Sequence, residues 1–393
     1  MSLRALLVLS LLSCVCVLTG CGDDGSSSDG GAGTSGDGDG DGDGDGDGDG
    51  DGDGDGDGEP CDVDRLEVTE PDEHLLSNLS VSGDTLVFLS VDLATFLGTI
   101  ESVTTDGEDP QTLHTPQGQR RVRSVMAYED TIYFLEENEE IVSTYELFAM
   151  PLAGGTPERI GDSGVSGGLI FGIDGTHIFT WESSIVHRIA IDGGAVERVG
   201  EAVGGGTASN MRLSGDDIFF MSGQTGSNAG MRATYRLDKA ATDAEADKLW
   251  DFPQQDDPCF NALGGLFATP TKLVCGYFSL ASRERDGTME EILFDGDVLT
   301  GPKIPMAVDG ENVYYGGTRL PPSPLTRMTS AGEDHEVVVC DTGTIGNKVA
   351  NGSFPIQNAY EVVVGDAEIY WVEQVAGVDG EAAPAFIIRR AAK

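Results

Sequence analysis

The chain has 393 residues, with 68 acidic residues against 23 Lys and Arg, and its formal net charge is −45. The first 60 residues hold 15 of the acidic residues and one basic residue, so the remainder still carries −31. A surface this acidic repels nucleic acid and anionic lipid headgroups, which excludes both as direct partners of the folded part.

The N-terminal segment has the layout of an export signal. Arg4 opens it, an apolar run covers residues 5–18, and small residues lead to Cys21. This run is short for a transmembrane helix, which needs about 20 apolar residues. The tetrapeptide Leu18-Thr19-Gly20-Cys21 resembles the lipobox of bacterial lipoproteins. An ordinary secretory signal with an incidental cysteine is the alternative.

The lipobox resemblance implies that a signal peptide, residues 1–20, is removed and that Cys21 carries the acyl chains. Membrane lipid is then a partner of the chain through Cys21, and two or more chains give stable anchoring. We therefore expect a lipid-anchored protein of the cell envelope. Gly22 follows Cys21 directly, and we place the protein at the outer rather than the inner membrane.

Residues 21–60 form a low-complexity linker. Eleven Asp-Gly pairs run from Asp37 to Gly58, and a segment without apolar residues cannot offset its ordering entropy. We expect a disordered, charge-extended spacer. An EF-hand is disfavoured because the repeat Asp residues are all odd-numbered, whereas the twelfth ligand of such a loop would fall on an even position, which is Gly here.

Four cysteines remain after the signal and the lipid site are set aside: Cys61, Cys259, Cys275 and Cys340. An even number in an exported chain predicts two disulfides, for which three connectivities are possible. We favour Cys259–Cys275 as the local pair, which leaves Cys61–Cys340. Their spacing matches no zinc template.

From about residue 76 onward the chain repeats a pattern of turn, β-branched and aromatic strand, gap and further strands. Gly83-Asp84 before Leu86-Val87-Phe88-Leu89 is the first copy. The strand of each copy lies at residues 86–89, 132–135, 177–181, 218–221, 273–278, 313–315 and 369–372. Gly-Gly and Asp-Gly pairs, which suit tight hairpins, separate the later strands. Each unit therefore reads as four short antiparallel strands.

Such repeats, without a convincing helix, predict an all-β fold: a β-propeller of seven four-stranded blades over residues 61–393. The repeats resemble the blades of bacterial TolB-like and NHL-like extracytoplasmic propellers. The last copy is one strand short, and residues 65–69 could supply that strand and close the ring. A β-sandwich array and a six-bladed ring are the alternatives.

No residue is assigned a catalytic role. Gly161-Asp162-Ser163-Gly164 matches the nucleophile segment of chymotrypsin-like proteases, but it is expected in a loop between blades and lacks a companion His segment. The histidines, which are His74, His114, His177, His187 and His335, form no metal-binding motif. We predict no metal and no cofactor. The three tryptophans are interpreted as packing residues.

With no catalytic motif assigned, the expected function is inferred from the propeller fold alone. We expect a non-catalytic binding or scaffold module whose partner is an envelope protein or peptide. One alternative is a hydrolase or lyase with polar residues gathered at the propeller channel. Another is a carbohydrate-binding surface.

Overall fold

The structure, a computed structural model, divides the chain into two units, Met1–Asp55 and Gly56–Lys393. It describes parts of the second unit only. These are residues 64–66, 74–92, 94–138, 144–166, 168–182, 184–201, 208–223, 232–252, 265–276, 279–288, 290–294, 303–317, 324–340, 362–375 and 385–393. Cys21, Cys61, Cys259 and the Asp-Gly run lie outside the described residues, so the predictions made for them stay predictions.

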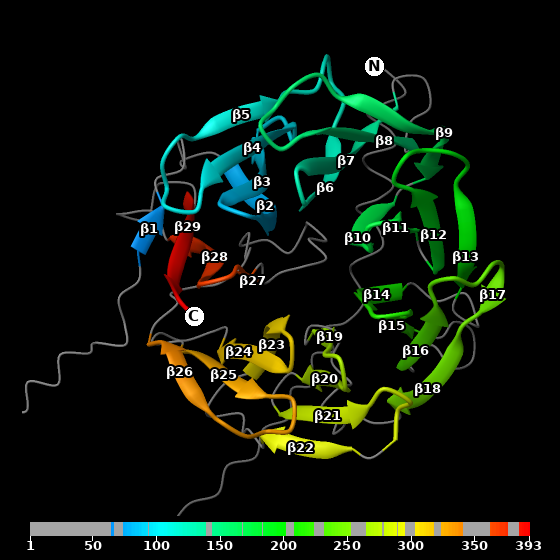
Figure 1. Cartoon of the computed structure of the whole chain (residues 1–393), viewed down its shortest axis with the longest axis vertical. Helices are drawn as coiled ribbons and strands as arrows, with labels where there is room; N and C mark the ends of the chain where they lie inside the picture. The colour runs from blue at the N-terminus through cyan, green and yellow to red at the C-terminus, as the bar shows by residue number, and fades with distance from the viewer. Residues whose placement is uncertain are drawn as a thin grey trace, which may run out of the picture. The chain divides into compact units, whose positions relative to one another are not determined.

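The described residues form 29 β-strands arranged as seven sheets, which are the blades of a propeller (Figure 1). Blade 1 consists of β2 (His74–Ser82), β3 (Thr85–Asp92), β4 (Gly98–Thr104) and β5 (Gln111–His114). Blade 2 consists of β6 (Val122–Tyr128), β7 (Thr131–Glu137), β8 (Thr144–Pro151) and β9 (Glu158–Ser166). Blade 3 consists of β10 (Leu169–Ile173), β11 (His177–Glu182), β12 (Ile185–Ala190) and β13 (Glu197–Glu201).

Blade 4 consists of β14 (Ala208–Ser214), β15 (Asp217–Gly223), β16 (Arg232–Asp238) and β18 (Asp247–Phe252). Blade 5 consists of β19 (Leu266–Ala268), β20 (Lys272–Gly276), β21 (Leu280–Glu284) and β22 (Glu291–Phe294). Blade 6 consists of β23 (Lys303–Asp309), β24 (Asn312–Gly317), β25 (Leu325–Thr329) and β26 (Glu336–Val339). Blade 7 consists of β27 (Val362–Val364), β28 (Glu368–Val375), β29 (Ala385–Ala392) and β1 (Asp64–Leu66).

The second strand of each blade carries the hydrophobic core, as the repeat predicts. Phe88, Phe134, Phe179, Phe219 and Trp371 are all fully buried. Side chains of one blade pack against those of the next in shared clusters, because a sheet with two apolar faces is stable only between neighbours. Trp181 and Trp250 are buried as well, which confirms the packing role predicted for the tryptophans.

The ring closes through the N-terminal strand. β1 pairs antiparallel with β29, placing Leu66 opposite Ile388, and so supplies the outer strand that the last repeat lacks. Leu66 is buried in a cluster that spans blades 7 and 1. The seven-bladed prediction and the closing role of this segment are thus confirmed; of the expected residues 65–69, the structure describes Arg65 and Leu66.

Two predictions need correction. The Gly161-Asp162-Ser163-Gly164 segment is not an interblade loop: it lies inside β9, at a register shift after which Val165 and Ser166 again pair with β8. Blade 3 gains a fifth strand, β17 (Ala244–Glu245), which lies in the connection between β16 and β18 and pairs parallel with β13. This pairing requires Gly200, since a Cβ there would collide with the Ala244 carbonyl oxygen.

Cys275 and Cys340 are both disulfide-bonded. Because Cys61 and Cys259 lie outside the described residues, the connectivity remains the prediction made from sequence spacing. Within the part of the chain that the structure describes, no helix is long and apolar enough to cross a membrane.

Candidate functional site

The topology gives the propeller two ends with different connections. We call the hairpin end the one where the first and second strands of each blade turn, as at Gly83-Asp84. We call the crossover end the one where each outer strand leads to the first strand of the next blade, as between β5 and β6. The first strands of the blades lie nearest the centre of the ring (Figure 1).

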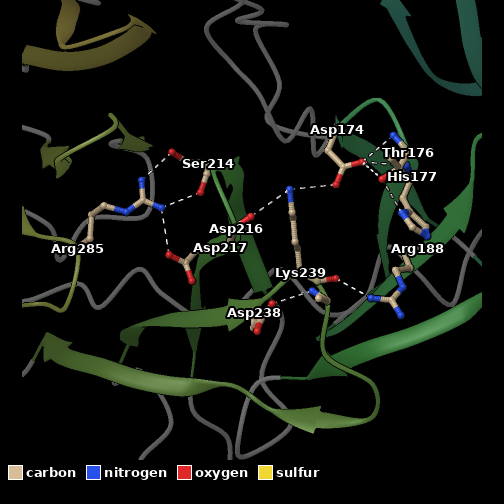
Figure 2. A network of polar contacts seen from close by, with 11 residues as sticks. Asp174, Thr176, His177, Arg188, Ser214, Asp216, Asp217, Asp238, Lys239 and Arg285 are labelled. Atoms are coloured by element: carbon tan, nitrogen blue, oxygen red, sulfur yellow. Dashed lines mark hydrogen bonds and ion pairs between the residues drawn. The ribbon is translucent and has the colours of Figure 1, made fainter.

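Several polar side chains at the hairpin end make contacts between neighbouring blades. Lys239, just after β16 of blade 4, places its Nζ 3.1 Å from the Asp174 carboxylate in the first turn of blade 3 (Figure 2). Arg285, at the corresponding place in blade 5, donates to the Ser214 carbonyl oxygen at 2.7 Å and to Asp217 at 3.1 Å. Lys393 of blade 7 pairs with Asp309 of blade 6 in the same way. These contacts hold neighbouring blades together, so we interpret them as stabilising the fold.

Three arginines differ from the other positively charged residues. Of the Lys and Arg residues whose side chains the structure describes, fourteen form an ion pair with a carboxylate. Arg121, Arg123 and Arg212 have no such partner among the described residues. In a chain with a formal charge of −45, an arginine without a carboxylate is unexpected. All three lie on, or directly before, a strand next to the ring centre.

Arg121 and Arg123 lie at the crossover end, where the chain enters β6 of blade 2. Val122 and Ser124 are buried, whereas both arginines are exposed, and this alternation puts the two guanidinium groups on the same side of an extended segment. Alternate residues of a strand are about 7 Å apart. A register shift between Val122 and Ser124 against β7 places a β-bulge at Arg123.

A buried carboxylate supports this arginine segment from beneath. Glu136, near the end of β7, is only 2% exposed. Its Oε1 lies 2.8 Å from Arg120 Nη1, and its Oε2 lies 2.6 Å from His114 Nε2 on the outer strand of blade 1. Arg120 Nε also donates to the Gln117 carbonyl oxygen at 3.2 Å. The three side chains therefore fix the connection between blades 1 and 2 in place.

Tyr145, at the start of β8, completes this group. Burial raises the pKa of its hydroxyl, and the negative charge of Glu137 raises it further. The positive charges of Arg123 and Arg121 lower the same pKa. Tyr145 therefore lies within electrostatic range of both unpaired arginines. We call Arg121, Arg123 and Tyr145 the arginine pair site. Two free guanidinium forks and a phenol hydroxyl are suited to binding carboxylate groups.

The histidines have different surroundings. His114 belongs to the support of the arginine pair site, whereas His74 contacts the Ser90 hydroxyl at 2.9 Å and His335 contacts Tyr315. His177 and His187 occupy neighbouring strands of blade 3, as predicted; burial lowers the pKa of His187. The described His, Cys, Asp and Glu side chains form no group of three or more that could hold a metal ion.

The sequence reading missed the arginine pair site. Its signal was the run Arg120-Arg121-Val122-Arg123, which concentrates three of the 23 basic residues in four positions. Whether an arginine has a carboxylate partner depends on neighbouring strands and cannot be read from the sequence.

No protein-family model matches this chain, and no curated protein matches it in sequence. Some solved structures are similar to this chain. A putative TolB from Agrobacterium tumefaciens is similar with a TM-score of 0.38 at 16% identity, over 60% of this chain and 89% of that one. A puromycin-hydrolyzing peptidase of Mycobacterium tuberculosis gives a TM-score of 0.49 at 11% identity, over 81% of this chain and 56% of that one.

An oligogalacturonate lyase in complex with manganese gives a TM-score of 0.40 at 11% identity, over 83% of this chain and 78% of that one. At such low identity the similarity describes the propeller fold alone.

Proposed function

We propose that this chain is a lipid-anchored envelope protein whose propeller binds an acidic peptide segment of a partner protein at the arginine pair site. The observation that carries the proposal is the absence, among the described residues, of a carboxylate partner for Arg121 and Arg123. All other described positive side chains but one have such a partner. A ligand that brings its own carboxylates would neutralise these two charges.

The spacing of the two arginines favours an extended peptide as the ligand. Alternate side chains of an extended peptide are also about 7 Å apart, so acidic residues at every second position would match Arg121 and Arg123. Each guanidinium can then form two parallel hydrogen bonds to one carboxylate. The acidic surface elsewhere on the domain repels misplaced acidic segments, which adds specificity.

A binding role is favoured over catalysis by the state of Glu136. It is the most buried carboxylate near the site, but Arg120 and His114 occupy its two oxygens. A general base must reach a proton on the substrate, and Glu136 is enclosed by its own partners. Its arrangement fits a support for the binding surface.

Membrane anchoring through Cys21 is part of the same proposal. Its support is the lipobox resemblance and the 38-residue stretch between Cys21 and Pro60. Metabolic labelling with radioactive palmitate should mark the protein, and Cys21→Ala should abolish the label and release the protein from membranes. Labelling that persists in Cys21→Ala would contradict this part.

Peptide binding is tested with full-length protein in detergent micelles and a fluorescent peptide in which Glu alternates with Ser. We expect saturable binding by fluorescence anisotropy, weakened at least tenfold in the double variant Arg121→Gln/Arg123→Gln. The matched control is Arg236→Gln, which removes an exposed arginine already paired with Asp247 and should bind like the wild type.

Further peptides and a polysaccharide separate the alternatives. A Lys-Ser peptide should not bind, and a peptide with its Glu residues in adjacent pairs should bind more weakly. Tighter binding of alginate, a carboxylated polysaccharide, would favour the carbohydrate-binding alternative. Equal affinity of the double variant and the wild type would refute the proposed site.

A further inference from the structure

The third unpaired arginine, Arg212, occupies a position that recurs in every blade. It lies two residues before the first turn of blade 4, on β14, the strand nearest the ring centre. The equivalent residues of the other blades are Ser80, Met126, Gly172, Phe267, Ala307 and Val363. None of these carries a charge, so Arg212 is the single cation of this ring of positions.

The contacts of Arg212 leave much of its guanidinium group unused. Nη1 donates to the Met211 carbonyl oxygen at 2.8 Å. The guanidinium carbon lies 4.3 Å from the centre of the Phe267 ring, on β19 of the next blade. Nε is buried and has no hydrogen-bond partner among the described residues. Burial also lowers the pKa of Arg212 to about 10.

An unsatisfied charged donor in such surroundings is energetically costly. Two other arginines that lie over aromatic rings also have a carboxylate partner. Arg283 stacks on Trp250 and also pairs with Glu290, and Arg285 lies over Phe219 and pairs with Asp217. Arg212 has the ring but not the carboxylate. Both Arg212 and Phe267 remain partly exposed, so solvent reaches the pair.

We propose that Arg212, which lies over the Phe267 ring, binds the carboxylate of a small organic acid where blades 4 and 5 meet. The aromatic face fixes the plane of the guanidinium group, which leaves its edge available for a bidentate contact with a planar carboxylate. This site is independent of the arginine pair site, which lies at the crossover end on blade 2.

The test measures thermal unfolding of the full-length protein with sodium benzoate, and with benzyl alcohol as the uncharged analogue at equal ionic strength. Benzoate at saturation should raise the unfolding temperature by roughly 2 °C or more, and benzyl alcohol should not. The variant Arg212→Met should lose the benzoate effect. Its unfolding temperature without benzoate should equal or exceed that of the wild type, because the buried Nε, which lacks a hydrogen-bond partner among the described residues, has been removed.

The unfolding temperature of Arg212→Met without benzoate shows whether Arg212 binds a ligand or stabilises the fold. Removal of a structural arginine would lower this temperature. Phe267→Leu keeps the charge but removes the ring, and should weaken benzoate binding several-fold. It also serves as the test if Arg212→Met does not fold. The double variant Arg121→Gln/Arg123→Gln should keep the full benzoate effect. No benzoate shift in the wild type, or an undiminished shift in Arg212→Met or Phe267→Leu, would overturn the proposal.

Discussion

The contact between blades 3 and 4 at the hairpin end allows a quantitative test of whether the ion pairs between blades stabilise the fold. Lys239 Nζ lies 3.1 Å from Asp174, which is 13% exposed, and 3.6 Å from Asp216, which is 96% exposed (Figure 2). The same ammonium group thus faces one sheltered and one solvated carboxylate. We predict that Asp174→Asn destabilises the protein measurably and that Asp216→Asn does not.

The magnitude follows from the partners of Asp174. Its Oδ1 accepts hydrogen bonds from the Thr176 amide at 2.9 Å, the Thr176 hydroxyl at 2.7 Å and the His177 amide at 2.8 Å. Asn can keep an oxygen at this place, but it loses the charge that strengthens these bonds and attracts Lys239. Since a hydrogen bond to a charged group contributes about 1.5–3 kcal/mol and partial exposure reduces ion-pair energies, we expect a loss of roughly 1–2 kcal/mol.

Urea unfolding followed by tryptophan fluorescence measures this loss, and its pH dependence gives a second check. Burial alone would raise the pKa of Asp174, but hydrogen bonds from Thr176 and His177, together with Lys239, outweigh burial and hold the pKa well below its usual value of 3.8. The carboxylate therefore contributes stability above about pH 4, and this stability is lost as the pH falls toward the pKa of the folded state.

The difference between the wild type and Asp174→Asn should therefore shrink as the pH is lowered from 7 to 3. Combining Asp174→Asn with Lys239→Met in a double-mutant cycle isolates the energy of the pair. Equal losses for Asp174→Asn and Asp216→Asn, or a difference independent of pH, would refute the assignment.

Three further substitutions test the supports of the ring. Glu136→Gln should cost about 1–3 kcal/mol in unfolding free energy, because it leaves Arg120 and His114 facing a neutral group. The affinity for the peptide should fall as well. An unchanged unfolding free energy together with an unchanged peptide affinity would contradict the role of Glu136 as a support of the arginine pair site. Gly200→Ala should detach β17, and hydrogen exchange should speed up at the Ala246 amide, which bonds to the Glu201 carbonyl oxygen at 3.0 Å; unchanged exchange there would show that the glycine is not required. Leu66→Ala should cost about 2–5 kcal/mol in unfolding free energy and make the ring closure at β1 sensitive to limited proteolysis. Val337→Ala, on an exposed site of outer strand β26, should have neither effect. Equal protease resistance of the two variants would argue against the role of Leu66 in closing the ring.

The blade architecture was predictable because each repeat combines a local turn with an apolar strand. Gly83-Asp84 and Asp309-Gly310 form tight turns whose glycines have positive φ, and the strands after them are buried in every copy. The closing role of residues 64–66 was also predictable, since the last copy lacked one strand.

Features that depend on neighbouring blades were not predictable in the same way. The two-residue strand β17 forms only because the outer strand of blade 3 offers a free edge and a glycine. The Gly161-Asp162-Ser163-Gly164 segment has loop composition and lies inside β9, in the register shift between Ile160 and Val165, which both pair with β8. Arg212 would have stood out had the seven first strands been aligned on their turns, whereas its lack of a carboxylate partner follows from tertiary structure alone.

The most direct test of the proposed function is an experimental structure of the protein with the alternating Glu-Ser peptide bound. We predict that two carboxylates of the peptide lie within hydrogen-bond distance, about 3 Å, of the guanidinium groups of Arg121 and Arg123, with Glu136 still enclosed by Arg120 and His114. A peptide bound at the hairpin end, or carboxylates that leave both arginines uncontacted, would contradict it.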